Sequence, residues 1–174
     1  MAKLRKMLGR ADAPETQALM RLIETQSRIT LAKWASDFAR ERYLPILQAA
    51  LPEEARPAKA LDACERVISG ECKFSAIKPV LRDAQAAARE CTDPLAQAAA
   101  RAISTACGVY GTPTNALGFM FYGAAAAAYA ELGLAASTFE YDAFAASEFE
   151  RALASLRSAA IENEPEPVKI DWNC

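Results

Sequence analysis

A long uncharged interval in the middle of the chain limits the fold more than any other feature. No Asp, Glu, Lys or Arg occurs between Arg101 and Glu131, and the stretch Ala116–Ala130 (ALGFMFYGAAAAAYA) is almost entirely apolar. Gly108 and the Gly-Thr-Pro-Thr-Asn run at 111–115 interrupt the interval, which a lipid-exposed helix would not tolerate. The uninterrupted part has 15 residues, against the about 20 that a membrane-spanning helix needs. We therefore predict a buried central helix, and we expect no membrane partner.

Helix start and stop signals divide the rest of the 174 residues into further segments. Pro45 predicts a kink or a break, and Ser137 with Glu140 three residues later forms a capping box. No stretch alternates apolar and polar residues, so we expect no strand. The chain is predicted to be an all-α, single-domain bundle of about six to seven alanine-rich helices with an irregular C-terminal tail. The expected helices span residues 13–26, 27–50, 57–70, 73–91, 94–109, 114–132 and 137–162.

The two ends of the chain differ in charge, and this indicates three parts. We expect a basic N-terminal segment at 1–11, a helical domain at 12–162, and an acidic, proline-containing tail at 163–174. No hydrophobic region follows the basic start, which argues against a secretory signal. The five cysteines form no Cys-x-x-Cys pair and are typical of reduced thiols. These features favour a cytoplasmic protein.

The overall charge balance speaks against nucleic acid as a partner. The formal net charge is −2, without the basic excess of a phosphate-binding protein. The last third of the chain is acidic, and we interpret it either as solvated helix faces and a soluble tail or as a surface that attracts a basic partner. The carboxylates that make it acidic include Glu140, Asp142, Glu148, Glu150, Glu162, Glu164, Glu166 and Asp171.

The residue types that most enzymes use are scarce in this sequence. Histidine is absent, which removes the usual base near neutral pH and the commonest metal ligand. Cys107 lacks a histidine to make it a thiolate, so we expect a buried structural thiol. No glycine-rich loop follows a strand to cradle phosphates. We therefore predict no catalytic residue, no metal and no cofactor.

Several polar residues nevertheless stand beside alanine runs and in the loop before the central helix. Arg101 follows such a run, where a guanidinium needs a carboxylate or carbonyl partner or must extend to the surface. A pocket between alanine-rich helices could bind a ligand there. The candidate binding residues are Arg56, Arg101, Tyr110, Thr112, Thr114 and Asn115.

An ordered series of short motifs suggests a family. It consists of Trp-Ala-Ser-Asp-Phe-Ala at 34–39, Arg-Pro-Ala-Lys-Ala-Leu at 56–61 with Gly-Glu at 70–71, Ala-Ala-Arg at 87–89 and 99–101, and Asn-Ala-Leu-Gly at 115–118. Over residues 29–133 this series resembles the immunity proteins of bacterial polymorphic toxin systems, in the family called immunity-protein-five-like. The resemblance implies an α-helical, non-enzymatic bacterial protein that protects a cell by binding a cognate toxin domain.

Two other hypotheses remain open at this stage. One is a helical small-molecule-binding protein or enzyme whose inter-helix pocket lies near Arg56, Arg101, Tyr110 and Asn115. The other is a structural or adaptor protein that forms a homo-dimer or larger oligomer through the Ala/Gly face of the helix at 114–132.

Overall fold

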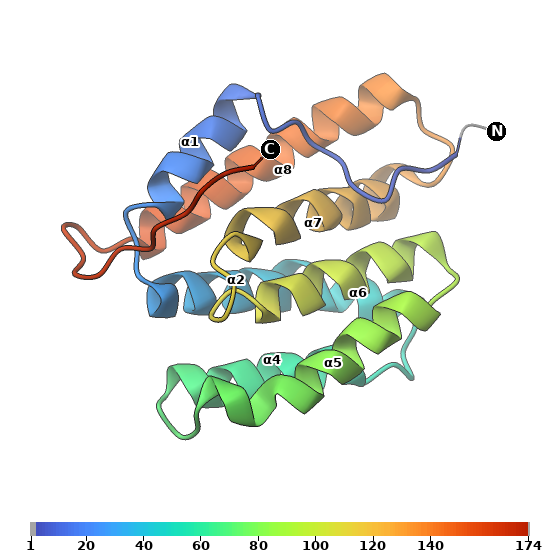
Figure 1. Cartoon of the computed structure of the whole chain (residues 1–174). Coiled ribbons are helices and arrows are strands. Elements are labelled where there is room, and N and C mark those ends of the chain that lie inside the picture. Colours follow the sequence, from blue (N-terminus) through green and yellow to red (C-terminus); the bar gives the residue numbers. More distant parts are fainter. Residues whose placement is uncertain (1–2, 174) are drawn as a thin grey trace.

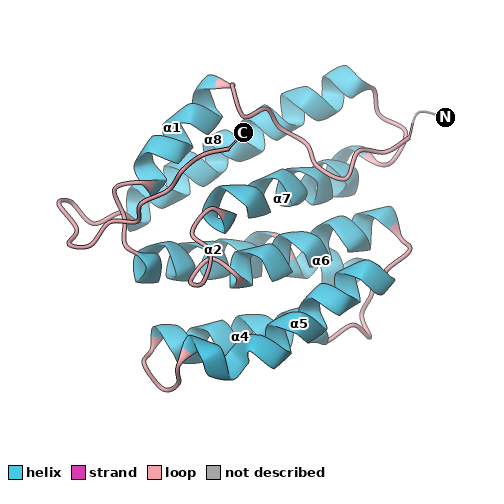
Figure 2. Ribbon diagram, in the orientation of Figure 1, coloured by secondary structure: helices cyan, strands magenta, loops and turns pink. Residues whose placement is uncertain are grey.

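The computed structural model describes residues 3–173, and within this range it contains eight helices and no strand (Figures 1 and 2). Residues 1–2 and 174, which the sequence places in the basic segment and the tail, lie outside the described part. The all-α, single-domain prediction is confirmed. The helices are α1 (Pro14–Ile23), α2 (Arg28–Arg42), α3 (Leu44–Ala50), α4 (Arg56–Ile68), α5 (Phe74–Glu90), α6 (Pro94–Cys107), α7 (Asn115–Leu132) and α8 (Thr138–Ala159).

The break between α2 and α3 follows from Pro45. Proline has no N–H to donate and its ring clashes with the carbonyl four residues earlier, so the helical ladder fails at Tyr43. Only this one residue separates α2 from α3. When the two are counted as one interrupted helix, residues 3–173 contain seven helices, within the predicted number. Tyr43 itself is fully buried and packs edge-on against Phe38 and Phe119.

The helices lie in a stack with α6 and α7 at its centre. Figure 1 shows α1 with α8 at one side, α4 with α5 at the other, and α2, α6 and α7 between them. α6 contacts α2, α3, α4, α5 and α7. This position explains its composition, because alanine lets several helices approach one helix closely at almost no propensity cost.

The uncharged stretch is the buried helix α7, as the sequence predicts. Ala124, Ala125, Ala126 and Ala128 are fully buried and Ala127 is 4% exposed. A side chain at Gly123 would overlap the ring of Tyr43, so glycine is required for this close approach. Within residues 3–173, no helix has the length and apolarity to cross a membrane. The alanine face is covered by the rest of the chain and is not accessible for the oligomer contact considered as an alternative, and a homo-dimer through another surface stays a prediction.

The N-terminal segment is packed across α7 and α8. Leu8 is 1% exposed, and its N–H donates to the Phe121 carbonyl at 3.0 Å. Gly9 has φ of +107°, and the ring of Phe149 fills the space where a Cβ would stand. The Tyr129 hydroxyl donates to the Arg5 carbonyl. The basic start of the chain is therefore held in a defined position.

The C-terminal tail folds back onto the connection between α1 and α2. Glu164 accepts hydrogen bonds from the Ser27 N–H, the Ser27 hydroxyl and the Thr30 hydroxyl. The Val168 N–H donates to the Gln26 carbonyl at 2.9 Å. A carboxylate at the N-terminus of α2 also interacts favourably with the helix dipole. These contacts attach the tail to the domain.

Candidate functional site

Arg56, the first of the predicted binding residues, is occupied by ion pairs within the chain. Its guanidinium donates to Glu54 through Nε at 2.9 Å and through Nη2 at 2.8 Å, and it also reaches Glu90 at 2.8 Å. The two carboxylates raise the pKa of Arg56. The residue therefore ties the loop before α4 to the end of α5.

Four other candidates lie at the connection between α6 and α7. The Tyr110 carbonyl accepts from Arg28 at 3.0 Å, and its ring packs on Phe74 with centroids 5.3 Å apart. Thr112 and Thr114 are exposed, and Asn115 starts α7. The space that Tyr110 lines holds only about 10 Å³, which is room for about one water molecule. The expected inter-helix pocket is therefore closed at this end.

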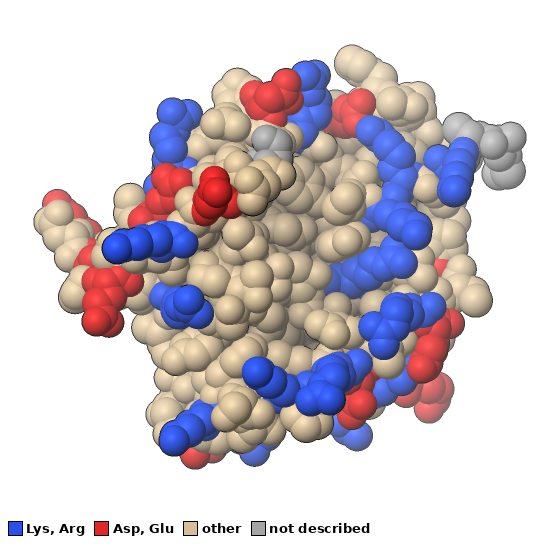
Figure 3. Space-filling view, viewed as in Figure 1, with Lys and Arg blue, Asp and Glu red and all other residues tan. Residues whose placement is uncertain are grey.

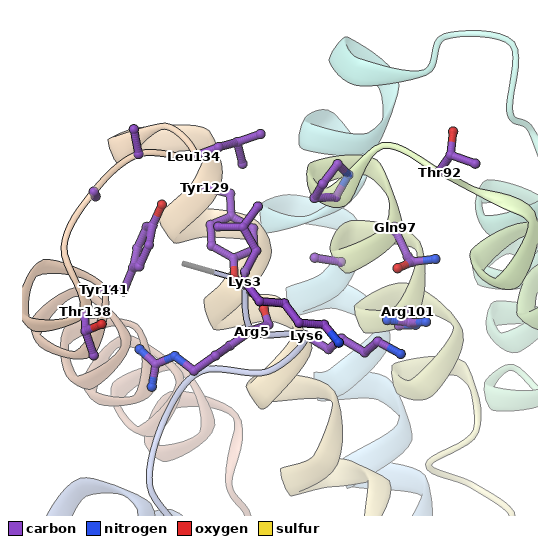
Figure 4. Close-up of a pocket in the computed structure, with 15 residues that line it drawn as sticks. Lys3, Arg5, Lys6, Thr92, Gln97, Arg101, Tyr129, Leu134, Thr138 and Tyr141 are labelled. Carbon is purple, nitrogen blue, oxygen red and sulfur yellow. Dashed lines mark hydrogen bonds between the residues drawn. The ribbon is translucent and has the colours of Figure 1, made fainter. Parts of the chain in front are cut away.

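Arg101 lies elsewhere, in a surface pocket of about 640 Å³. Three structural parts form this pocket: residues 3–6, the start of α6, and the turn between α7 and α8 (Figure 4). Arg56 and Tyr110 line two other pockets. Arg56, Arg101 and Tyr110 thus line three separate pockets, so the structure does not unite them in one cavity, and a binding role for each stays a prediction.

The pocket that contains Arg101 is positively charged. Lys3, Arg5 and Lys6 also line it, and no Asp or Glu does so within residues 3–173. Arg5 is paired with Asp142 at 2.7 Å. In Figure 4, Lys3 and Lys6 extend toward the side where Arg101 lies, whereas Arg5 points to the opposite side. Figure 3 shows Lys and Arg side chains gathered along one side of this face of the molecule.

Sequence reasoning identified Arg101 but missed the lysines as parts of the same pocket. The only available signal is the basic composition of residues 1–11. It does not indicate where that segment packs, because its position depends on contacts with α7 and α8 that are remote in sequence.

Much of the acidic last third is engaged inside the chain. Glu140 completes the capping box of α8, Asp142 pairs with Arg5, and Glu148 is 1% exposed and pairs with Arg42. Glu164 binds the start of α2. The acidic surface is therefore smaller than the sequence suggests, and the remaining exposed carboxylates of this set are Glu150, Glu162, Glu166 and Asp171.

The four cysteines within residues 3–173 are free thiols, of which Cys64 and Cys107 are buried and Cys72 and Cys91 are partly exposed. Cys107 is 2% exposed, which confirms the expected buried thiol. The hydrogen bond with the Cys64 thiol, together with burial, raises the pKa of Cys107 well above its ordinary value. Among residues 3–173, no three His, Cys, Asp or Glu side chains gather closely enough to hold a metal ion.

The fold and the pocket define a small all-α protein with a preformed, positively charged surface pocket. Residues 21–155 match the family described as Imm-5 like putative immunity protein, and the chain belongs to this family. The match includes Arg101 and the turn between α7 and α8 but leaves residues 3–6 outside. No curated protein and no solved structure matches the chain.

Proposed function

We propose that this chain is an immunity protein that binds a cognate toxin domain and blocks it sterically, without chemistry of its own. The observation that carries the proposal is the family match over residues 21–155. The site of action would be the bacterial cytoplasm, where the toxin would otherwise damage the producing cell.

The packing of the chain ends supports a binding role. Leu8 anchors the N-terminal segment and Glu164 anchors the tail, so the described parts of both terminal segments pack on the domain without a partner. A preformed surface loses little conformational entropy on association, which favours tight binding. A toxin domain could therefore dock on this surface with little rearrangement.

The test is co-expression with the toxin domain encoded by the neighbouring gene. We expect restored growth and a stable complex in size-exclusion chromatography. An unrelated toxin domain of similar charge serves as the control and should be neither bound nor neutralised. If the neighbouring toxin kills the cells regardless and no complex forms, the proposal is wrong.

A further inference from the structure

We infer, on the basis of the proposed toxin-binding function, that the pocket around Arg101 docks an acidic segment of the toxin. Carboxylates of that segment would face Lys3, Lys6 and Arg101, which we call the cation cluster. An aliphatic or aromatic side chain of the same segment would pack on the exposed turn between α7 and α8. The juxtaposition of the cation cluster with this apolar turn points to such a partner.

The cation cluster lacks counter-charges of its own. Within residues 3–173, no carboxylate lies within ion-pair distance of Lys3, Lys6 or Arg101, whereas Arg5 and Arg56 both have carboxylate partners. Like charges on one pocket repel one another, and an incoming carboxylate removes this repulsion. The cluster is therefore electrostatically complementary to an acidic segment and would speed its capture.

The backbone that carries the cluster is also fixed before binding. Arg101 projects from α6, the central helix of the stack. Lys3 and Lys6 flank Arg5, whose carbonyl accepts from Tyr129 and whose guanidinium is held by Asp142 at 2.7 Å. The rings of Tyr129 and Tyr141 meet edge-on with centroids 5.2 Å apart and contribute to the pocket lining. Such preorganisation lowers the entropy cost of binding.

Exposed apolar side chains, which we call the apolar rim, lie at the turn between α7 and α8, which lines one side of the pocket. Phe139 is 81% exposed at the start of α8, directly after Thr138, which lines the pocket. Leu134 also lines the pocket and is 42% exposed, and Leu132 is 38% exposed. Aromatic and arginine side chains carry a large share of the binding energy in protein interfaces. Because one pocket contains both Arg101 and apolar residues of this turn, its occupant is more readily a protein segment.

A nucleic acid fits the same surface less well. Its phosphates would suit the cation cluster, but a polyanion continuing past the pocket would meet Glu140 on the first turn of α8. The net charge of −2 also opposes a long polyanion. A short acidic peptide segment satisfies the cluster and the apolar rim without this repulsion.

The experiment measures the dissociation constant of the complex with the neighbouring-gene toxin domain by isothermal titration calorimetry. The pocket variant carries Lys3→Gln, Lys6→Gln and Arg101→Gln together. The control variant carries Arg21→Gln, Lys78→Gln and Lys169→Gln, which remove the same charge from exposed positions outside the pocket. We expect the pocket variant to bind at least about 30-fold more weakly and the control variant to stay within about 3-fold of the wild type.

A second variant, Phe139→Ser, tests the apolar rim separately. Its expected loss is about 10-fold, because an exposed aromatic anchor is removed while the charge stays the same. Circular dichroism and thermal unfolding of every variant check that the helical fold is retained.

The outcomes separate the inference from the proposed function. If the wild type binds the toxin and the pocket variant binds equally well, the inference is wrong while the proposed function stands. If the wild type does not bind the toxin at all, the proposed function fails and the inference fails with it. Light scattering that shows a dimer of the wild type but a monomer of the pocket variant would instead assign the pocket to a second copy. Comparable affinity for inorganic phosphate alone would assign it to small anions.

Discussion

The ion pair between Arg42 and Glu148 provides a stringent test of how the core is stabilised. Glu148 is 1% exposed and accepts two hydrogen bonds from the Arg42 guanidinium, at 3.1 and 2.6 Å. The Tyr43 hydroxyl donates a third at 3.1 Å. Burial, followed by the charge of Glu148, raises the pKa of Tyr43 well above its usual range, so its hydroxyl stays a donor. The perturbation is Arg42→Met, which leaves this carboxylate buried without its main partner.

The structure sets the expected magnitude. Removing one partner of a buried ion pair costs about 3–5 kcal/mol, because the remaining charge is desolvated without compensation. Arg42 is 29% exposed, and Arg151 stays 3.6 Å from Glu148, so some compensation remains. We therefore expect the lower end, about 3 kcal/mol, which corresponds to a fall of about 6–12 °C in Tm for a chain of this size. Glu148→Gln should cost less, about 1–2 kcal/mol, since Arg42 can then turn to water.

The assay is urea unfolding followed by circular dichroism at pH 7. Arg40→Met is the matched control, because Arg40 makes an exposed ion pair with Asp62 at 2.9 Å. Exposed pairs contribute about 0–1 kcal/mol, so this control should unfold close to the wild type. A loss below about 1 kcal/mol for Arg42→Met, equal to that of Arg40→Met, would refute the reasoning that Glu148 depends on its buried partner.

The two helical glycines of α7 should respond oppositely to alanine. Gly123→Ala forces a methyl group into the buried Tyr43 ring and should cost about 1–3 kcal/mol in thermal unfolding. Gly118→Ala places its Cβ 3.7 Å from the nearest side-chain atom and should be neutral or stabilise by up to about 1 kcal/mol. For the tail, partial burial acts to raise the pKa of Glu164, but hydrogen bonds from the start of α2, including Ser27, outweigh it and lower the pKa. Glu164→Gln should therefore cost about 1 kcal/mol at pH 7 in urea unfolding, and the difference should disappear as the pH falls through the lowered pKa of the carboxyl.

Each of these expectations has a defined contrary result. Equal stability of the two α7 variants would mean that the Tyr43 ring does not occupy the space beside Gly123. For the tail, Glu162→Gln is the control, as an exposed carboxylate two residues earlier. If it destabilises as much as Glu164→Gln, or if the deficit of Glu164→Gln persists at pH 3, the hydrogen bonds to α2 do not stabilise the tail.

Local sequence signals predicted most of the helix boundaries. Pro45 breaks the helix where its missing N–H requires, and the Ser137–Glu140 capping box starts α8. Asp93 caps α6 by accepting from the Ala96 N–H at 2.8 Å. These outcomes were predictable because each depends on residues within one helical turn of each other.

The candidate site was predicted only in part. Arg101 was identified because a guanidinium beside an alanine run must find a partner or reach the surface, and it lines the charged pocket. Lys3, Lys6 and Phe139 were not associated with it, because their proximity depends on where the N-terminal segment and the α7–α8 turn pack. Whether Arg56, Thr112, Thr114 and Asn115 contact a partner stays a prediction.

The sequence by itself determined the helical class, the buried uncharged helix and the family, because hydrophobic periodicity, caps and short motifs act over a few residues. Only the tertiary structure decided which charged side chains form ion pairs or hydrogen bonds within the chain and which remain free to bind a partner. Asp142 forms an ion pair with Arg5, and Glu164 accepts hydrogen bonds from the start of α2. The cation cluster has no carboxylate partner within residues 3–173. The physical reason is that an ion pair or a pocket requires specific distances between side chains, and packing of remote segments sets those distances.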